Sequence, residues 1–257
     1  MSSFDPLLSV DRLTVTAGDN TLVNQVSFDV PRGAIVAVAG GSGSGKTTVG
    51  LSILRLLPPA LLVRQGGIVF EGKNLLDFSG EDMRRIRGGR IGMVFQEPQS
   101  ALDPLFTIGR QMDEVLSAHT TLSKAQRYQK ALETLDEVQL PQGQRVYKSF
   151  PHQLSGGMRQ RAMVALAVAC GPSLVIADEP TSSLDVTLAA RIMELFVRLK
   201  AKGISILLIA HDLGMISRIA DDVVILKQGE VVEKGPAAKV LAGPAHEYTR
   251  ALIEAAL

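Results

Sequence analysis

Residues 40–48 read Gly40-Gly41-Ser42-Gly43-Ser44-Gly45-Lys46-Thr47-Thr48. This stretch matches G-x-x-x-x-G-K-[ST], the pattern of a phosphate-binding loop. The short run 34–39 before it is uncharged and partly β-branched, which predicts a buried strand. Residues 49–57 after it have helical spacing and stop before Pro58. The sequence therefore predicts a glycine-rich loop that joins a buried strand to a helix.

The residue types in this loop suit the phosphates of a nucleotide. Glycines let the backbone curl closely around phosphate oxygens, and the N–H groups at a helix start attract anions. Lys46 can reach the β- and γ-phosphates, and the Thr47 hydroxyl can bind Mg²⁺. A flexible Gly/Ser turn is the simplest alternative, but it explains neither the Lys-Thr pair nor the preceding strand. We therefore expect the whole stretch 40–48 to bind nucleotide.

Two carboxylates follow a second apolar run. Asp178 and Glu179 come directly after residues 174–177, which predict another buried strand. At the C-terminal end of a strand, Asp178 can hold Mg²⁺ through water molecules. Glu179 can orient and deprotonate a water molecule for attack on a γ-phosphate. The alternative is an acidic turn with solvated charges, which a preceding phosphate-binding loop makes less favoured.

A second glycine-containing helix start precedes these carboxylates, at Leu154-Ser155-Gly156-Gly157-Met158-Arg159-Gln160-Arg161. An ordinary helix capped by Ser155 would explain part of this run. Its sequence and its place before the Asp178 strand resemble the signature motif of ABC-transporter ATPase cassettes. Three further motifs, one before this run and two after it, stand in the order typical of that family, so the resemblance covers essentially the whole chain. Gln96 resembles the Q-loop, Ser183-Leu184-Asp185 the D-loop, and His211 the switch histidine.

The resemblance implies an α/β fold, that of a P-loop NTPase. It would have a RecA-like core, an N-terminal antiparallel β subdomain and an α-helical subdomain. We expect one ABC ATPase domain over residues 1–257, with the core and the β subdomain in 1–95 and 162–257. The helical subdomain would be 96–161, where strand-like runs give way to helical patterns, and Ser123 can cap one of its helices.

Other runs of the chain predict strands. The β-rich runs 7–16 and 22–30 flank a turn at 17–20, and residues 66–72 predict another short strand. Residues 222–226 and 230–233 predict a hairpin across 227–229.

The resemblance also implies ATP and Mg²⁺ as cofactors and ATP hydrolysis as the reaction. Glu179 and His211 would be catalytic. Thr47, Gln96 and Asp178 would bind the magnesium ion.

The remaining site residues of the resemblance would act between two cassettes. Ser155, Gly156, Gly157 and Gln160 would contact ATP held by the partner subunit. Asp185 would lie at the dimer interface.

The stretch 96–104 narrows the expected partners. It resembles the extended Q-loop of importers for oligopeptides, dipeptides and nickel, and residues 151–153 and 244–252 fit that group too. Many of its members continue into a cysteine-bearing extension, whereas this chain ends at Leu257 and so looks more like the short nickel-type members. We expect a heterodimer with a second, similar cassette, two transmembrane permeases and an extracytoplasmic solute-binding protein. The imported solute would be peptides or nickel and other metal chelates.

One departure from the family concerns the adenine base. The family usually has an aromatic residue near the turn 17–20, and no aromatic lies between Asp5 and Val26. Either Phe4 or an aliphatic side chain such as Val15 takes its place, or the base is held weakly.

The charge balance argues against nucleic acid as a partner. The 27 Lys and Arg nearly match the 26 Asp and Glu, which argues against a nucleic-acid binder.

No secretory signal or membrane-spanning run is found, so we expect a peripheral protein on the cytoplasmic face of the membrane. The alternatives are a soluble P-loop NTPase, a non-transport ABC ATPase, and an inactive scaffold. The last is disfavoured because all four expected catalytic and nucleotide-binding residues are present, namely Lys46, Asp178, Glu179 and His211.

Overall fold

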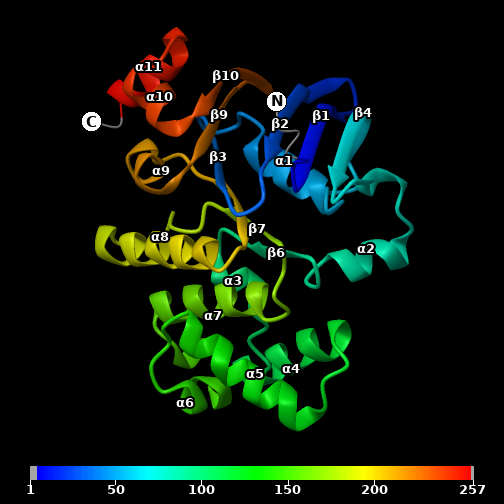
Figure 1. Cartoon of the computed structure of the whole chain (residues 1–257), viewed down its shortest axis with the longest axis vertical. Helices are drawn as coiled ribbons and strands as arrows, with labels where there is room; N and C mark the ends of the chain where they lie inside the picture. The colour runs from blue at the N-terminus through cyan, green and yellow to red at the C-terminus, as the bar shows by residue number, and fades with distance from the viewer. Residues whose placement is uncertain (1–4, 256–257) are drawn as a thin grey trace. The chain divides into compact units, whose positions relative to one another are not determined.

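The computed structural model of the chain describes residues 5–255. These form two compact units, one built from the residues up to Met83 and from Val197 onward, the other from Arg84–Phe196. Figure 1 labels most of their helices and strands. Helices α2 (Gly80–Ile86) and α8 (Val186–Ala201) carry the chain from one unit to the other.

The first unit contains an antiparallel sheet with the strand order β2-β1-β4-β5. Along β1 the side chains of Leu8, Val10, Leu13 and Val15 are buried, because alternating apolar residues line one face of a strand. The predicted strands 7–16 and 22–30 are confirmed. The sheet comprises β1 (Leu8–Ala17), β2 (Asn20–Val30), β4 (Leu61–Phe70) and β5 (Lys73–Asn74).

Strand β4 is longer than the sequence predicts, since the pattern indicates a strand only from Gly66 onward. The first half of β4 pairs with the end of β1, where Leu61 faces Ala17. The register shifts between these halves, and Gly66 there has φ +102°. Its α-carbon passes so close to the carbonyl of Asp11 that a Cβ would lie 2.6 Å from that oxygen. This irregularity interrupts the alternation on which the sequence prediction depends.

The first unit also holds the strands β10-β9-β3-β8, in that order. Strand β3 is parallel to β8 and β9, and all five of its residues are buried, as expected of a parallel strand covered on both faces. The predicted hairpin across 227–229 is confirmed, since β9 and β10 pair antiparallel. The strands are β3 (Ile35–Ala39), β8 (Ser205–Ile209), β9 (Asp222–Lys227) and β10 (Glu230–Pro236). The helices are α1 (Lys46–Ile53), η1 (Leu75–Asp77), α9 (Leu213–Ile219), α10 (Ala237–Ala242) and α11 (Glu247–Glu254).

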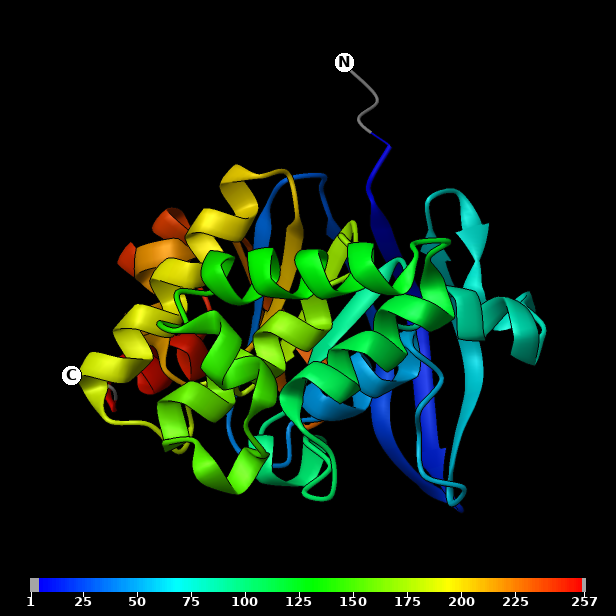
Figure 2. The ribbon, with the colours of Figure 1, turned by 90° about the horizontal axis from the view of Figure 1, so that it is seen from below.

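The second unit consists mainly of helices beside the parallel pair β6 (Ile91–Val94) and β7 (Leu174–Asp178). Helices α4 to α7 pack against one another and appear together, in green, in Figures 1 and 2. Ser123 caps α5 as predicted, and Gln126 completes a capping box. The helices are α3 (Pro98–Ala101), α4 (Ile108–His119), α5 (Lys124–Glu137), α6 (Gly143–Lys148), η2 (Pro151–Gln153) and α7 (Gly156–Val168).

Among residues 5–255, no helix is both long enough and apolar enough to cross a membrane.

Candidate functional site

The glycine-rich loop connects the end of β3 to the start of α1, as the sequence predicts. Gly45 is the residue before the helix and has φ +96°, a conformation that side chains disfavour. Gly40 opens the loop in direct contact with β9, where an added Cβ would overlap the carbonyl oxygen of Leu226. Both positions therefore require glycine, the first for its backbone conformation and the second for its close approach.

Lys46 lies across this loop. Its side chain is only 5% exposed, and Nζ donates hydrogen bonds to the carbonyl oxygens of Gly40 (3.0 Å) and Gly41 (2.9 Å). The hydroxyl of Ser44 is also buried and has no hydrogen-bond partner among the described residues. A buried cation, an unpaired hydroxyl and a curled glycine backbone are chemically complementary to phosphate oxygens. The loop residues therefore fit a nucleoside triphosphate.

Tyr248, on α11, supports the loop from the C-terminal part of the chain. Its hydroxyl accepts a hydrogen bond from the N–H of Gly41 at 3.0 Å, and the ammonium of Lys227 lies 5.0 Å from its ring centre. Sequence reasoning missed this residue. The available signal was its position in the stretch 244–252, which already resembled the tail of one importer group.

Glu233 fastens the start of this tail. Its carboxylate accepts hydrogen bonds from the backbone N–H groups of Ala245 (2.8 Å) and His246 (3.1 Å). Burial acts to raise the pKa of Glu233, but the Thr249 hydroxyl, these two N–H groups and the charge of His246 together outweigh it and leave the pKa below its ordinary value. The carboxylate is thus kept charged, which favours the tail position that presents Tyr248 to the loop.

His211 and the glycine-rich loop leave the same edge of the parallel strands. In the register of β3 and β8, Val38 faces Ile209, and the N–H of Ala210 donates to the carbonyl of Val38 at 3.2 Å. Gly40 and His211 each follow two residues after that pair. The histidine is exposed there. The structure thus brings the sequence-predicted His211 to the strand edge that carries the loop.

Asp178 and Glu179 likewise lie at the C-terminal end of a parallel strand, in the second unit. Asp178 ends β7 and is 4% exposed, and Glu179 comes directly after it with φ +43°. Val94 faces Ala177 in the register of β6 and β7, so Gln96 and Glu179 both lie two residues beyond one pair. Their side chains meet, since Gln96 Nε2 donates to Glu179 Oε2 at 3.4 Å.

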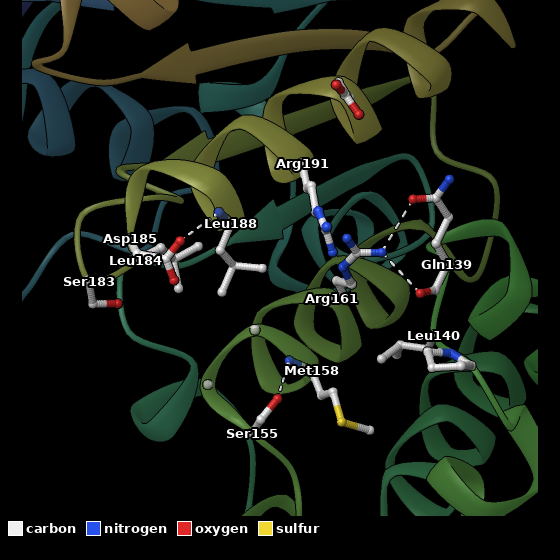
Figure 3. A pocket seen from close by; sticks show the side chains of 14 residues that line it. Gln139, Leu140, Ser155, Met158, Arg161, Ser183, Leu184, Asp185, Leu188 and Arg191 are labelled. Carbon is white, nitrogen blue, oxygen red and sulfur yellow. Dashed lines mark hydrogen bonds between the residues drawn. The ribbon is translucent and has the colours of Figure 1, made fainter.

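The signature-like run opens α7 and lines a hollow of about 810 Å³ in the second unit. Figure 3 shows Ser155 and Asp185 among its lining residues. Ser155 Oγ accepts from the N–H of Met158 at 3.4 Å, and Asp185 Oδ1 accepts from the N–H of Leu188 at 2.9 Å. Each side chain thereby caps a helix start, α7 and α8 respectively. A Cβ on Gly157 would come within 2.5 Å of Leu188, so glycine permits the close approach of these helices.

Gln160 does not line this hollow. Its side chain is fully buried, and Nε2 donates to the carbonyl oxygen of Pro180 at 2.6 Å. The sequence grouped Gln160 with residues that contact a partner's ATP. That role stays a prediction, and the buried contact with Pro180 does not favour it.

The adenine question is answered in part. Val15 is fully buried in the β1 face that packs into the core, so the idea that it carries the base is wrong. Phe4 lies outside the described residues.

The predicted nucleotide loop and His211 belong to the first unit. The second unit carries the other predicted site residues, Gln96, Ser155, Gly156, Gly157, Gln160, Asp178, Glu179 and Asp185.

A sequence profile described as ABC transporter matches residues 23–182. The chain belongs to the ABC transporter family. It is 45% identical over 230 residues to the "Probable peptide ABC transporter ATP-binding protein y4tR" of Sinorhizobium fredii, covering 89% of this chain and 69% of that protein. It is 40% identical to the oligopeptide transport ATP-binding protein OppD of Bacillus subtilis, covering 96% of this chain and 71% of that protein.

A solved ABC structure has the same fold. It is the dimeric post-hydrolysis state of the ATP-binding cassette MJ0796 bound to ADP and Pi. The TM-score is 0.79 at 28% identity, and the match covers 90% of this chain and 98% of that one. The predicted fold class, a P-loop ABC cassette, is therefore confirmed. As an ABC cassette, the chain is an ATP hydrolase that binds ATP with Mg²⁺.

Proposed function

We propose that the chain powers the import of peptides, as the ATPase subunit of an ABC importer. The support for peptides is that relatives named for peptide transport share 40–45% identity with most of the chain. Nickel and other metal chelates are the alternative solutes, because the stretch 96–104 resembles importers of both kinds. A non-transport ABC ATPase is the alternative from another functional class, and the near-neutral charge of the chain argues against nucleic acid as its target.

The observation that carries the ATPase role is the buried ammonium of Lys46 on the carbonyls of Gly40 and Gly41. Phosphate oxygens are stronger acceptors for an ammonium than neutral carbonyls. Lys46 would therefore exchange these contacts for the β- and γ-phosphates, while the stretch 40–48 surrounds the rest of the triphosphate. As the family resemblance implies, Thr47, Gln96 and Asp178 would hold Mg²⁺ through oxygen atoms.

Glu179 is proposed as the general base. Bound Mg²⁺-ATP supplies the γ-phosphate that is cleaved. The Glu179 carboxylate would take a proton from the attacking water, and Gln96, which already touches this carboxylate, would keep it oriented. His211 would position the water from its exposed place at the end of β8.

A second cassette would complete the site. Ser155, Gly156 and Gly157 would present a helix start to the γ-phosphate of ATP on that subunit, because backbone N–H groups at a helix start attract anions. Asp185, on the wall of the same hollow, would act across the interface. We further propose a heterodimer, with residues 96–161 as a helical subdomain that meets two permeases at the cytoplasmic face of the membrane. An extracytoplasmic solute-binding protein would deliver the solute.

The test is co-purification of the chain with its membrane partners, followed by ATPase assays in liposomes. Peptides, nickel chelates and no solute are compared, with Lys46→Ala as the inactive control. Stimulation by peptides alone is expected. Stimulation by nickel chelates alone would replace the proposed solute. Failure to recover any membrane protein, with ATPase activity intact, would favour the non-transport alternative.

A further inference from the structure

Gln160 is an unusual residue to find within α7, most of whose residues are buried. Its side chain has no exposed surface, and its carbonyl oxygen Oε1 has no hydrogen-bond partner among the described residues. A buried acceptor without a partner costs free energy, which an apolar side chain of similar size would avoid. The compensating contribution of glutamine here is its donor, because Nε2 bonds to the carbonyl oxygen of Pro180 at 2.6 Å.

The residue before Pro180 has a strained backbone. Glu179 has φ +43°, in the left-handed region that residues with side chains rarely adopt. A following proline adds to the strain, because it restricts the preceding residue to extended conformations. Such conformations persist only where the surroundings hold them in place.

Two hydrogen bonds flank this strained residue. The N–H of Ser182 donates to the carbonyl of Glu179 at 3.2 Å, within the same turn. The bond from Gln160 reaches the next carbonyl from a different element, α7. The position of the Glu179 backbone therefore depends on a contact with α7, and the side chain of Glu179 starts from that backbone toward Gln96.

We propose that Gln160 is a positioning residue for Glu179, which it holds beside Gln96 through the Pro180 carbonyl. Because Ser155, Gly156 and Gly157 begin the same helix, a shift of that helix start is passed to the base by this bond. The inference rests on the proposed role of Glu179 as general base. It gives Gln160 a function that does not require contact with a nucleotide.

The decisive variant is Gln160→Glu, studied in the assembled transporter. Glutamic acid has nearly the same shape, but it donates to the Pro180 carbonyl only while protonated, and burial raises the pKa of such a carboxyl. Above that pKa the charged carboxylate faces a carbonyl oxygen and repels it. The kcat ratio of variant to wild type should therefore fall about 10- to 100-fold at high pH and recover as the pH is lowered. Because the kcat of the variant is divided by the wild-type kcat at the same pH, the titration of groups common to both proteins cancels.

Two companion variants separate positioning from stability. Gln160→Met fills the space without a donor, so its kcat should be low at every pH while KM for ATP changes less than about twofold. Thr134→Val is the matched control in the same unit. Thr134 is 1% exposed, and its hydroxyl donates to the carbonyl of Lys130 within α5, so its loss removes a buried polar group far along the chain from Glu179.

A readout without turnover is amide hydrogen exchange in the nucleotide-free chain. Gln160→Met should speed exchange at the Ser182 amide selectively, whereas Thr134→Val should leave it unchanged. A pH-independent kcat ratio for Gln160→Glu, or wild-type exchange at Ser182 in Gln160→Met, would overturn the proposal. If Glu179→Gln kept full hydrolysis, the general-base assignment would fail instead, and the exchange result would still report on the bond itself.

Discussion

Two strand ends in this protein adopt backbone conformations that ordinary residues avoid, and they do so by different means. After β3, the positive φ values belong to glycines, such as Gly43 (+74°) and Gly45 (+96°). After β7, the positive φ belongs to Glu179, which carries a side chain and precedes a proline. The first end is built from residues that tolerate the conformation, and the second is held by a contact with α7.

The difference reflects what each strand end must present. A phosphate-binding loop presents backbone N–H groups, so glycine serves it without loss. A general base must present a carboxylate, so the residue in the strained position cannot be glycine. The protein therefore supports Glu179 from outside, and this support is a separate point at which the site can be damaged.

The largest expected effect is at the supported end. Glu179→Gln keeps the shape of the side chain but removes the base, so hydrolysis should fall by about 100-fold or more. ATP binding should persist, because the loop after β3 is untouched. Steady-state ATPase assays on the assembled transporter measure the loss of hydrolysis, and calorimetry measures the retained ATP binding. Turnover near wild type would remove Glu179 from catalysis and end the comparison between the two strand ends.

The next effect is at the glycine-rich end. Lys46→Ala removes the ammonium that now bonds to the carbonyls of Gly40 and Gly41. Hydrogen bonds to charged groups contribute about 1.5–3 kcal/mol, so the Kd for Mg²⁺-ATP should rise about tenfold or more. Calorimetric titration measures it, with Lys239→Ala, an exposed lysine on α10, as the control. An unchanged Kd would contradict the assignment of the loop.

A smaller effect tests whether the glycine-rich end also relies on support from outside. Tyr248→Phe removes only the hydroxyl that accepts from the Gly41 N–H. A neutral hydrogen bond contributes about 0.5–1.5 kcal/mol, so ATP affinity should fall between about twofold and tenfold. Tyr128→Phe, in the other unit, is the control. If affinity stays at the wild-type value, the loop is organised by its own residues and the contrast with Glu179 becomes sharper.

The smallest effect concerns the base rather than the phosphates. Val15 is buried, so an aliphatic residue there does not support adenine. GTP should therefore compete with ATP within about tenfold, which corresponds to about 1.4 kcal/mol. Ala17→Tyr adds a ring at the end of β1 and should tighten ATP binding several-fold, since stacking contributes about 0.5–1.5 kcal/mol. Competition binding measures both. A strong preference for ATP in the unmodified chain would mean that another residue holds the base.

The amino-acid sequence by itself determined the parts that depend on neighbours along the chain. The strand, loop and helix around Lys46, the cap of α5 by Ser123 and the hairpin at 227–229 are set by local residue types. A glycine in a tight loop or a serine before a helix acts within a few residues of itself. For the same reason the order of motifs was enough to predict the family and the fold.

Only the tertiary structure decided the contacts that join distant segments. Gln160 and Pro180 are 20 residues apart, and Gly41 and Tyr248 are 207 apart. Neither pairing leaves a local pattern, because a buried amide or a tyrosine hydroxyl has the same neighbours in sequence whichever partner it meets. The early start of β4 is also set by its partner, since the end of β1 pairs with residues that alternate too irregularly to predict a strand. The bond between Gln160 and Pro180 is the contact that holds Glu179 in place, so the proposed catalytic function depends on this long-range contact.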